Sequence, residues 1–350
     1  MNKILSLIIP SYNMEAYLPK CLGSLIVDDK ELLQKLDVIV VNDGSTDRTS
    51  KIAHEFETKY PGVFRVIDKE NGHYGSCINA ALPLANGTFV KVLDADDSYV
   101  TDALTRLIIK LSTISNEVDM VLTDHAFVDS EGNVREKPGL RLTTNAPCDI
   151  ADIIPDYDQV MIWNTAYRKS VLNKAGYFQT EGIAYTDLEW VSIPVAYVRK
   201  LYHMPVCLYL YSAEREGQSM SASIVSKSAD MFETVLDDMM LAYDKQRMSF
   251  GKDATLFFSL QIYRQARIIY GLYLYRLSIL DAVRRLSLMD DKLSRQNGEL
   301  FDKLAYAFLV GPGHGLYIVK MYRKAVGARM LVICGLRLYI ALTKIVCKWR

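Results

Sequence analysis

The first 125 residues alternate short apolar runs, rich in β-branched side chains, with longer segments whose apolar residues recur at helical spacing. The short runs predict buried strands, and the longer segments predict helices. The expected strands are Leu5–Ile9, Asp37–Asn42, Val63–Ile67, Phe89–Leu93 and Asp119–Leu122, and the expected helices are Glu15–Val27, Thr46–Tyr60, Tyr74–Ala85 and Asp102–Leu111. Because strands and helices alternate, we expect an α/β fold with a mostly parallel sheet and flanking helices. Ligands bind beyond the carboxyl ends of such strands, so the loops after the first four strands form the candidate site.

The remainder of the chain follows a different pattern. Residues 126–225 mix loops marked by Gly and Pro with short aromatic segments, whereas residues 226–302 have the spacing of long amphipathic helices. We therefore expect a domain over residues 1–225, an all-helical region over 226–302 and a basic helical tail over 303–350.

Charge and composition narrow the function classes. The 350 residues include 41 Lys and Arg and 41 Asp and Glu, a zero formal charge that argues against a nucleic-acid partner. The six cysteines are scattered without a C-x-x-C pair, which argues against a zinc ribbon or a disulfide framework and fits a reducing cytosol. No uncharged apolar stretch reaches the roughly 20 residues that span a bilayer, so we expect a cytoplasmic protein.

Three carboxylates follow the fourth expected strand, at Asp94, Asp96 and Asp97. They repel one another, and a divalent cation such as Mn²⁺ or Mg²⁺ is the natural compensator. Asp94 and Asp96 are two residues apart, so in an extended segment both side chains lie on the same side and can bind one ion. A solvated acidic turn, or a cap for the helix near Thr101, is the alternative interpretation.

The other loops at this edge are also polar. The segment 42–47 contains Asp43 and has the composition of an ordinary turn or helix cap. The loop Lys69–Ser76 opens a helix, so its backbone N–H groups are available to bind an anion. Neither a G-x-G-x-x-G motif nor a P-loop is present, which argues against a nicotinamide dehydrogenase or a P-loop nucleotidase.

Taken together, these segments resemble the family 2 glycosyltransferases, which have a GT-A fold. The resemblance is carried by Leu7–Asn13, Val41–Asp47, Asn71-Gly72 and Val92–Asp97, and it continues through Trp163–Arg168, Glu181–Asp187 and Arg215–Ser221. It covers roughly residues 1–225, in the order and spacing of the family.

The resemblance implies a role for each matched residue. Tyr12 would stack on the nucleobase of a nucleotide-sugar donor, and Asp43 would accept a hydrogen bond from the ring N–H of that base. Asp94 and Asp96 would hold Mn²⁺ or Mg²⁺ on the diphosphate. Asp187 would be the catalytic base, and Thr186 stands where the family has a Glu. The remaining donor-binding positions are Pro10, Asn13, Asn71, Gly72, Arg215 and Ser219, of which the last two match a segment that closes over the diphosphate.

The chemistry of the reaction asks for the same groups. Breaking a sugar–diphosphate bond develops negative charge on the leaving phosphates, and an acceptor hydroxyl must lose a proton as it attacks. With one candidate base, we expect direct displacement with inversion at the sugar carbon. A sugar nucleotidyltransferase and a catalytically inactive carbohydrate-binding or scaffold protein are the alternatives.

Four aromatic residues could line an acceptor site, but aromatic residues at this density more often belong to the hydrophobic core. They are Trp163, Tyr167, Tyr177 and Trp190.

The tail has its own pattern. Residues 303–350 contain nine Lys and Arg and no acidic residue. On a helical wheel, Arg329, Arg337, Lys344 and Lys348 share one narrow stripe, and the rest of the surface is apolar. We expect this helix to lie in the interface of an anionic membrane with its cations towards the headgroups, on the inner face of the cell membrane beside a lipid-linked glycan acceptor. Packing in a helical bundle or a homo-oligomer contact is the alternative.

Overall fold

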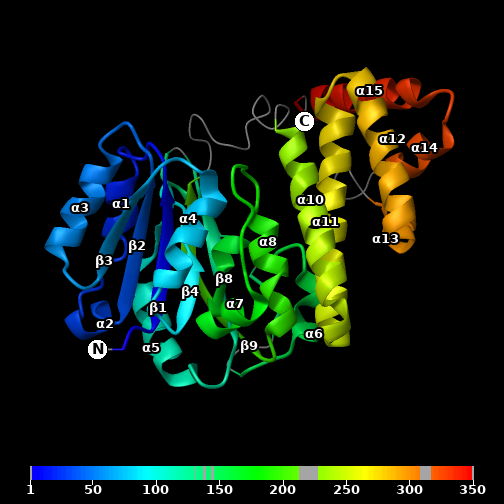
Figure 1. Ribbon diagram of the computed structural model, residues 1–350. Helices are drawn as coiled ribbons and strands as arrows, with labels where there is room; N and C mark the ends of the chain where they lie inside the picture. Colours follow the sequence, from blue (N-terminus) through cyan, green and yellow to red (C-terminus); the bar gives the residue numbers. More distant parts are fainter. Residues whose placement is uncertain are drawn as a thin grey trace. The chain divides into compact units, whose positions relative to one another are not determined.

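The computed structural model describes residues 2–129, 131–136, 139–142, 146–212, 228–307 and 317–348. The chain divides into two compact units. The first combines Met1–Gln218 with Asp238–Gln261, and the second combines Ser219–Asp237 with Ile262–Arg350. Figure 1 shows the sheet of the first unit and the helices of the second.

One mixed sheet organises the first unit, with strand order β3-β2-β1-β4-β8-β6-β9-β5. The parallel half consists of β1 (Leu5–Ser11), β2 (Leu36–Asp43), β3 (Phe64–Lys69) and β4 (Phe89–Val92). β8 (Thr165–Arg168) runs antiparallel to both β4 and β6 (Met120–Val128), and β9 (Leu201–Ser212) runs parallel to β6. Two short antiparallel strands, β5 (Ser98–Tyr99) and β7 (Val134–Glu136), pair with β9 and β6. The predicted mostly parallel α/β sheet is thus confirmed.

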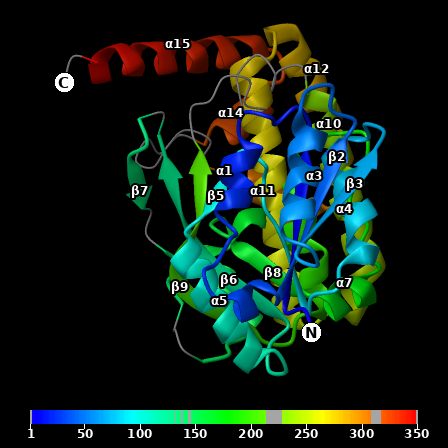
Figure 2. The same cartoon turned by 90° about the vertical axis from the view of Figure 1, so that its left-hand side faces the viewer.

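Helices cover the sheet on both faces, which explains why β1 and β2 are buried along their whole length. Successive side chains of a strand point to opposite faces. Leu7 and Ile9 therefore belong to the hydrophobic core that also contains residues of α1 (Leu18–Gly23), α3 (Thr49–Lys59) and α5 (Thr101–Ile114). α4 (His73–Ala81) also contacts β1 and β2, but its residues are not part of that core. Figure 2 shows these layers from the side.

The remaining helices of the first unit are short. They are α2 (Lys30–Leu33), α6 (Ile150–Ile153), α7 (Lys169–Ala175) and α8 (Asp187–Ser192). Single 3₁₀ turns lie at Leu82–Leu84, Ile154–Asp156, Ile162–Asn164, Pro194–Tyr197 and Arg247–Ser249. The helix expected over Glu15–Val27 is shorter than predicted, because Pro19 lies at its first turn and the helix ends at Gly23.

Long helices follow, as predicted for residues 226–302. α10 (Ala229–Gln246) and α11 (Lys252–Arg276) contribute to both units, and α12 (Ile279–Gln296), α13 (Gly298–Leu304), α14 (Ile318–Lys324) and α15 (Arg329–Lys348) belong to the second. Within that unit the Arg323 guanidinium donates to Asp290 at 2.8 Å and stacks 3.6 Å from the centre of the Phe301 ring. Among the residues that the structure describes, every helix is too short or too polar to cross a bilayer.

Candidate functional site

Four loops converge at the carboxyl edge of the parallel strands. In the register of the sheet, Ser11 at the end of β1 is aligned with Asn42, and Asp43 at the end of β2 is aligned with Lys69. The first two loops are joined at Asn13, whose backbone N–H donates to Ser45 Oγ at 3.0 Å and whose Oδ1 accepts from Thr46 N at 2.9 Å. Parallel pairing thus brings together residues distant in sequence.

Asp43 is the buried anion of this edge. Its Oδ1 accepts from Lys69 Nζ at 2.6 Å and from the backbone N–H of Gly72 at 3.0 Å. Its carbonyl oxygen accepts from Asn71 Nδ2 at 2.9 Å. Gly44 is required here, because its φ is +72° and a Cβ would lie 2.9 Å from Asn71 N. The expected donor residues Asp43, Asn71 and Gly72 therefore form one bonded cluster, and the Gly72 N–H is already used by Asp43.

The loop after β1 presents an aromatic ring beside this cluster. Pro10 is buried in β1 opposite Val41, whereas Tyr12 is 47% exposed. In the described part of the chain, three residues other than glycine have positive φ: Asn13, His73 and Tyr185. Asn13 and Tyr185 stand in loops that carry the candidate site and His73 begins α4, where unfavourable backbone conformations are held by the surrounding contacts.

Asp94 lies close enough to two other acidic side chains, Asp96 and Asp187, to be affected by their charges. Its Oδ1 accepts from the Tyr74 hydroxyl at 2.7 Å, and its Oδ2 lies 3.3 Å from the Tyr209 hydroxyl. Burial, followed by the negative charges of Asp96 and Asp187, raises its pKa to about 7. Tyr74 lies on α4 and Asp187 is the first residue of α8. The tertiary structure thus brings two helices to the loop after β4, which the sequence alone had predicted as part of the site.

The segment from Asp94 to Asp97 is a turn, closed by a hydrogen bond from Asp97 N to Asp94 O at 3.0 Å. β4 ends at Val92, so the expectation that Asp94 and Asp96 share one side of an extended segment is wrong. Asp97 is buried, and it accepts from the Tyr209 hydroxyl at 2.6 Å and from Ser212 N at 2.7 Å. Burial and the charges of its acidic neighbours raise the pKa of Asp97 to about 8.

The carboxylates of Asp94 and Asp96 can hold a divalent cation only together with a further ligand. In the described ranges, no three His, Cys, Asp or Glu side chains are arranged to hold a metal ion. Mg²⁺ in proteins is commonly held by one or two carboxylates together with substrate phosphates. Asp94 and Asp96 supply two mutually repelling carboxylates, and the hydroxyls of Tyr74 and Tyr209 that lie beside Asp94 carry no positive charge. These residues therefore fit a cation that is shared with a phosphate ligand.

Thr186, which precedes Asp187, has a structural role. It is fully buried, and its Oγ1 accepts from Gln179 Nε2 at 2.6 Å. The Gln179 side chain in turn accepts from the Tyr177 hydroxyl at 2.8 Å. This buried chain of hydrogen bonds fixes the segment that ends at Asp187.

A second buried contact on α8 was missed by the sequence reasoning. Glu189 is 1% exposed, and its two carboxylate oxygens contact Thr180, at 2.9 Å from N and 2.8 Å from Oγ1. The same Oγ1 lies 2.9 Å from Asp238 Oδ2. One hydroxyl proton can serve only one of these two carboxylates. Burial, and the nearby charge of Asp238, raise the pKa of Glu189 to about 7. No sequence pattern marks Thr180 or Asp238.

This contact holds the segment before Asp187 against α4. Gly75 of α4 has no Cβ, and one built there would collide with the carbonyl oxygen of Thr180. Asn79, one turn further along α4, donates to Gln179 O at 2.8 Å and accepts from Gln179 N at 2.9 Å. The helix that carries Tyr74 is thus locked to the segment that carries Asp187.

The aromatic residues divide into two groups. Tyr167, Tyr177 and Trp190 are buried and pack edge to face, as expected for a core. Trp163 is only half-buried, and its ring centre lies 5.3 Å from that of Tyr211. Burial, together with the negative charges of the site carboxylates, raises the pKa of Tyr211 to about 12, so this pair lies near those carboxylates. Two further expected site residues, Arg215 and Ser219, lie outside the described residues.

Comparison with known proteins gives consistent matches. Residues 6–175 match the model of the family described as Glycosyl transferase family 2. The uncharacterized glycosyltransferase MG025 homolog of Mycoplasma pneumoniae is 38% identical over 106 residues, which is 30% of this chain and 35% of the relative. The minor teichoic acid biosynthesis protein GgaB of Bacillus subtilis is 30% identical over 139 residues, 39% of this chain and 15% of the relative. The matched segments thus span about a third or less of these relatives.

A solved structure matches over a larger share of the chain. The crystal structure of S. aureus TarS 1-349 in complex with UDP-GlcNAc has a TM-score of 0.54 and 19% sequence identity. The match covers 92% of both chains. It shows that the two share a fold.

Proposed function

Given that residues 6–175 of this chain belong to glycosyl transferase family 2, we propose that the protein moves a sugar from a nucleotide-diphosphate donor to a hydroxyl group of a glycan. The observation that carries the proposal is the convergence of Asp94, Asp96 and Asp187: burial, together with the charges of Asp96 and Asp187, raises the pKa of Asp94 to about 7. Such a cluster is stable once positive charge enters it, and it leaves a further carboxylate for the acceptor.

The donor side is built from the loops after β1, β2 and β3. The exposed ring of Tyr12 would stack on the base, and the carboxylate of Asp43 would accept its ring N–H, held in position by Lys69 and Gly72. Pro10, Asn13 and Asn71 shape this edge, and Arg215 and Ser219 would close over the diphosphate. We propose a UDP-sugar, because the TarS structure of the same fold holds UDP-GlcNAc.

The reaction side is built from the loop after β4 and the start of α8. Asp94 and Asp96 would hold Mn²⁺ or Mg²⁺, which when bound neutralises charge that develops on the leaving diphosphate. Asp187 would take the proton from the attacking hydroxyl on the opposite face of the sugar, so the configuration at the sugar carbon inverts. Tyr74 would orient Asp94 through the hydrogen bond that its hydroxyl donates, and the Tyr209 hydroxyl would stand beside Asp94 Oδ2.

The acceptor side has the half-buried pair Trp163 and Tyr211 next to the carboxylates. Aromatic faces with a few polar groups are typical of sites that bind small molecules. We propose a glycan of a cell-surface polysaccharide, carried on a lipid at the inner face of the membrane. The relative GgaB, named for teichoic acid biosynthesis, supports this class of product. Residues 1–225 would carry the reaction, and the helices of 226–302 and 303–350 would serve the acceptor.

One incubation tests the proposal. The purified chain is mixed with a panel of nucleotide sugars, a glycan acceptor mixture and Mn²⁺, and the released nucleotide is identified. Release of a nucleoside diphosphate that requires the metal is expected. Pyrophosphate-dependent formation of a nucleoside triphosphate would instead identify a sugar nucleotidyltransferase. No turnover with any donor, together with retained glycan binding, would identify an inactive carbohydrate-binding or scaffold protein.

A further inference from the structure

The two faces of helix α15 have opposite roles from those that the helical wheel predicts. Arg329 and Arg337, expected to point to lipid headgroups, contact neighbouring helices of the second unit. Arg329 Nη1 donates to Ser287 Oγ of α12 at 2.7 Å, and Arg337 Nε donates to Leu274 O of α11 at 2.9 Å. Arg337 also donates to Leu277 O, just after α11 ends. A cation at a helix C-terminus satisfies free carbonyl groups and favours the helix dipole, which explains the inward orientation.

The apolar face of α15 is consequently exposed. Leu331 is 72% exposed and Leu338 is 61% exposed. Met321 of α14 and Val326 in the connection between the helices are also exposed. Met321 and Leu331 line the same apolar pocket, and exposed apolar side chains gathered around such a pocket mark a binding face. We call the exposed side chains of Met321, Val326, Met330, Leu331 and Leu338 the apolar face.

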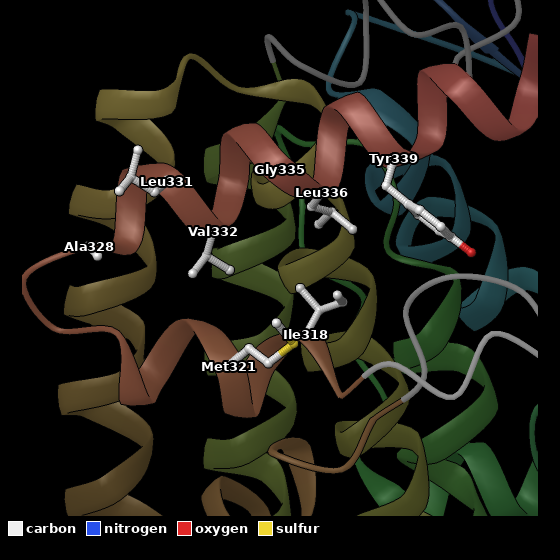
Figure 3. A pocket seen from close by; sticks show the side chains of 8 residues that line it. All are labelled: Ile318, Met321, Ala328, Leu331, Val332, Gly335, Leu336 and Tyr339. Atoms are coloured by element: carbon white, nitrogen blue, oxygen red, sulfur yellow. The ribbon is translucent and has the colours of Figure 1, made fainter.

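A groove runs along this face between α14 and α15. Its cavity has a volume of about 400 Å³. Ile318 and Met321 of α14 point towards Val332 and Leu336 of α15 across it (Figure 3). Gly335 lies on the wall, and a Cβ built there would meet nothing within 4 Å. The groove is therefore open and apolar, and an extended hydrocarbon chain is the ligand that matches its lining.

The net charge of the second unit indicates which kind of partner binds the apolar face. The second unit holds 17 Lys and Arg and 8 Asp and Glu, a net charge of +9, whereas the first unit has a net charge of −9. A second copy seated on the apolar face would bring two units of +9 together, which is unfavourable. An anionic lipid surface offers both the apolar phase and the opposite charge.

We propose that the apolar face of α14 and α15 docks on an anionic lipid bilayer, with an acyl or polyprenyl chain of a membrane lipid in the groove. Leu331 and Leu338 enter the acyl boundary, and Arg329 and Arg337 hold α15 to the bundle beneath it. The net charge of the second unit attracts the protein to the surface, and burial of the apolar face retains it. This inference is independent of the reaction proposed above.

The test is co-sedimentation of the full chain with vesicles of phosphatidylcholine alone or of phosphatidylcholine with phosphatidylglycerol, at rising NaCl. The variant Leu331→Glu/Leu338→Glu alters the apolar face. The matched control is Leu280→Glu/Leu288→Glu on α12 of the same unit, whose leucines are 70% and 61% exposed. Both variants add the same charge, so their difference reports the apolar face alone. Light scattering measures the oligomeric state of each protein, and nucleotide release from a UDP-sugar without vesicles measures basal activity.

Wild type and control should bind the phosphatidylglycerol vesicles and lose binding as salt rises, while the face variant binds at least about tenfold more weakly. Basal nucleotide release should be the same in all three proteins. The proposal is overturned if wild type ignores phosphatidylglycerol, or if control and face variant lose binding equally. It is also overturned if the face variant binds vesicles normally and instead converts a dimer to a monomer. If none of the three proteins, wild type included, releases nucleotide, the result counts against the proposed reaction, and the vesicle-binding result still stands.

Discussion

Replacing Glu189 by Gln should remove about 3 kcal/mol of the pH dependence of stability. Burial raises the pKa of Glu189 from 4.5 to about 7, against the hydrogen bonds from Thr180 that favour the carboxylate. The folded state therefore binds this proton more tightly than the unfolded state. The resulting stability is fully present below about pH 4.5 and is lost as the pH rises through about 7. A difference of one in pKa is worth about 1.4 kcal/mol, so the loss amounts to about 3 kcal/mol.

Gln has the shape of the protonated acid, because its amide N–H can donate to Thr180 Oγ1 while its carbonyl accepts from Thr180 N. It has no proton to lose in this range. Denaturant unfolding at about pH 5 and about pH 8.5, followed by the fluorescence of Trp163 and Trp190 in the first unit, measures the difference. Wild type should lose about 3 kcal/mol more than Glu189→Gln between the two conditions. The exposed Glu117→Gln is the control, and it should behave as wild type. Parallel pH profiles of wild type and Glu189→Gln would refute the raised pKa of Glu189.

Further substitutions address the reaction and the packing of the site. Asp96→Asn should lower kcat by roughly 100-fold with unchanged circular dichroism, and Asp94→Asn should weaken the dependence on metal; a wild-type rate and Mn²⁺ titration for Asp96→Asn would contradict the metal assignment. Asp187→Asn should abolish transfer while UDP-sugar binding by calorimetry is unchanged, and Glu189→Gln should keep most of kcat; an inactive Glu189→Gln beside an active Asp187→Asn would move the base to Glu189. Gly75→Ala should lower the free energy of unfolding by about 1–3 kcal/mol because its Cβ meets the Thr180 carbonyl, whereas Gly23→Ala, with nothing within 4 Å, should not; equal melting temperatures would argue against the close approach.

Local patterns in the sequence determined the frame of the molecule. Apolar β-branched runs predicted the parallel strands, because a strand buried on both faces must be apolar along its length. Parallel strands end at one edge, so the sequence also predicted that the loops of Asp43 and Asp94 belong to one site. Long amphipathic helices after residue 226 followed from their spacing. β9, by contrast, was not predicted, because its half-buried residues do not alternate cleanly.

Tertiary structure alone decided how the charges meet. The approach of Asp187 to Asp94, the hydroxyls of Tyr74 and Tyr209, and the contact of Thr180 with Glu189 join segments that no local pattern relates. The tail makes the same point. Helical periodicity correctly placed Arg329 and Arg337 on one stripe, but it could not tell which side of that helix would be covered. Free carbonyl groups at the end of α11 attract Arg337 inward, and they come within reach of α15 only when the helices of the second unit pack together.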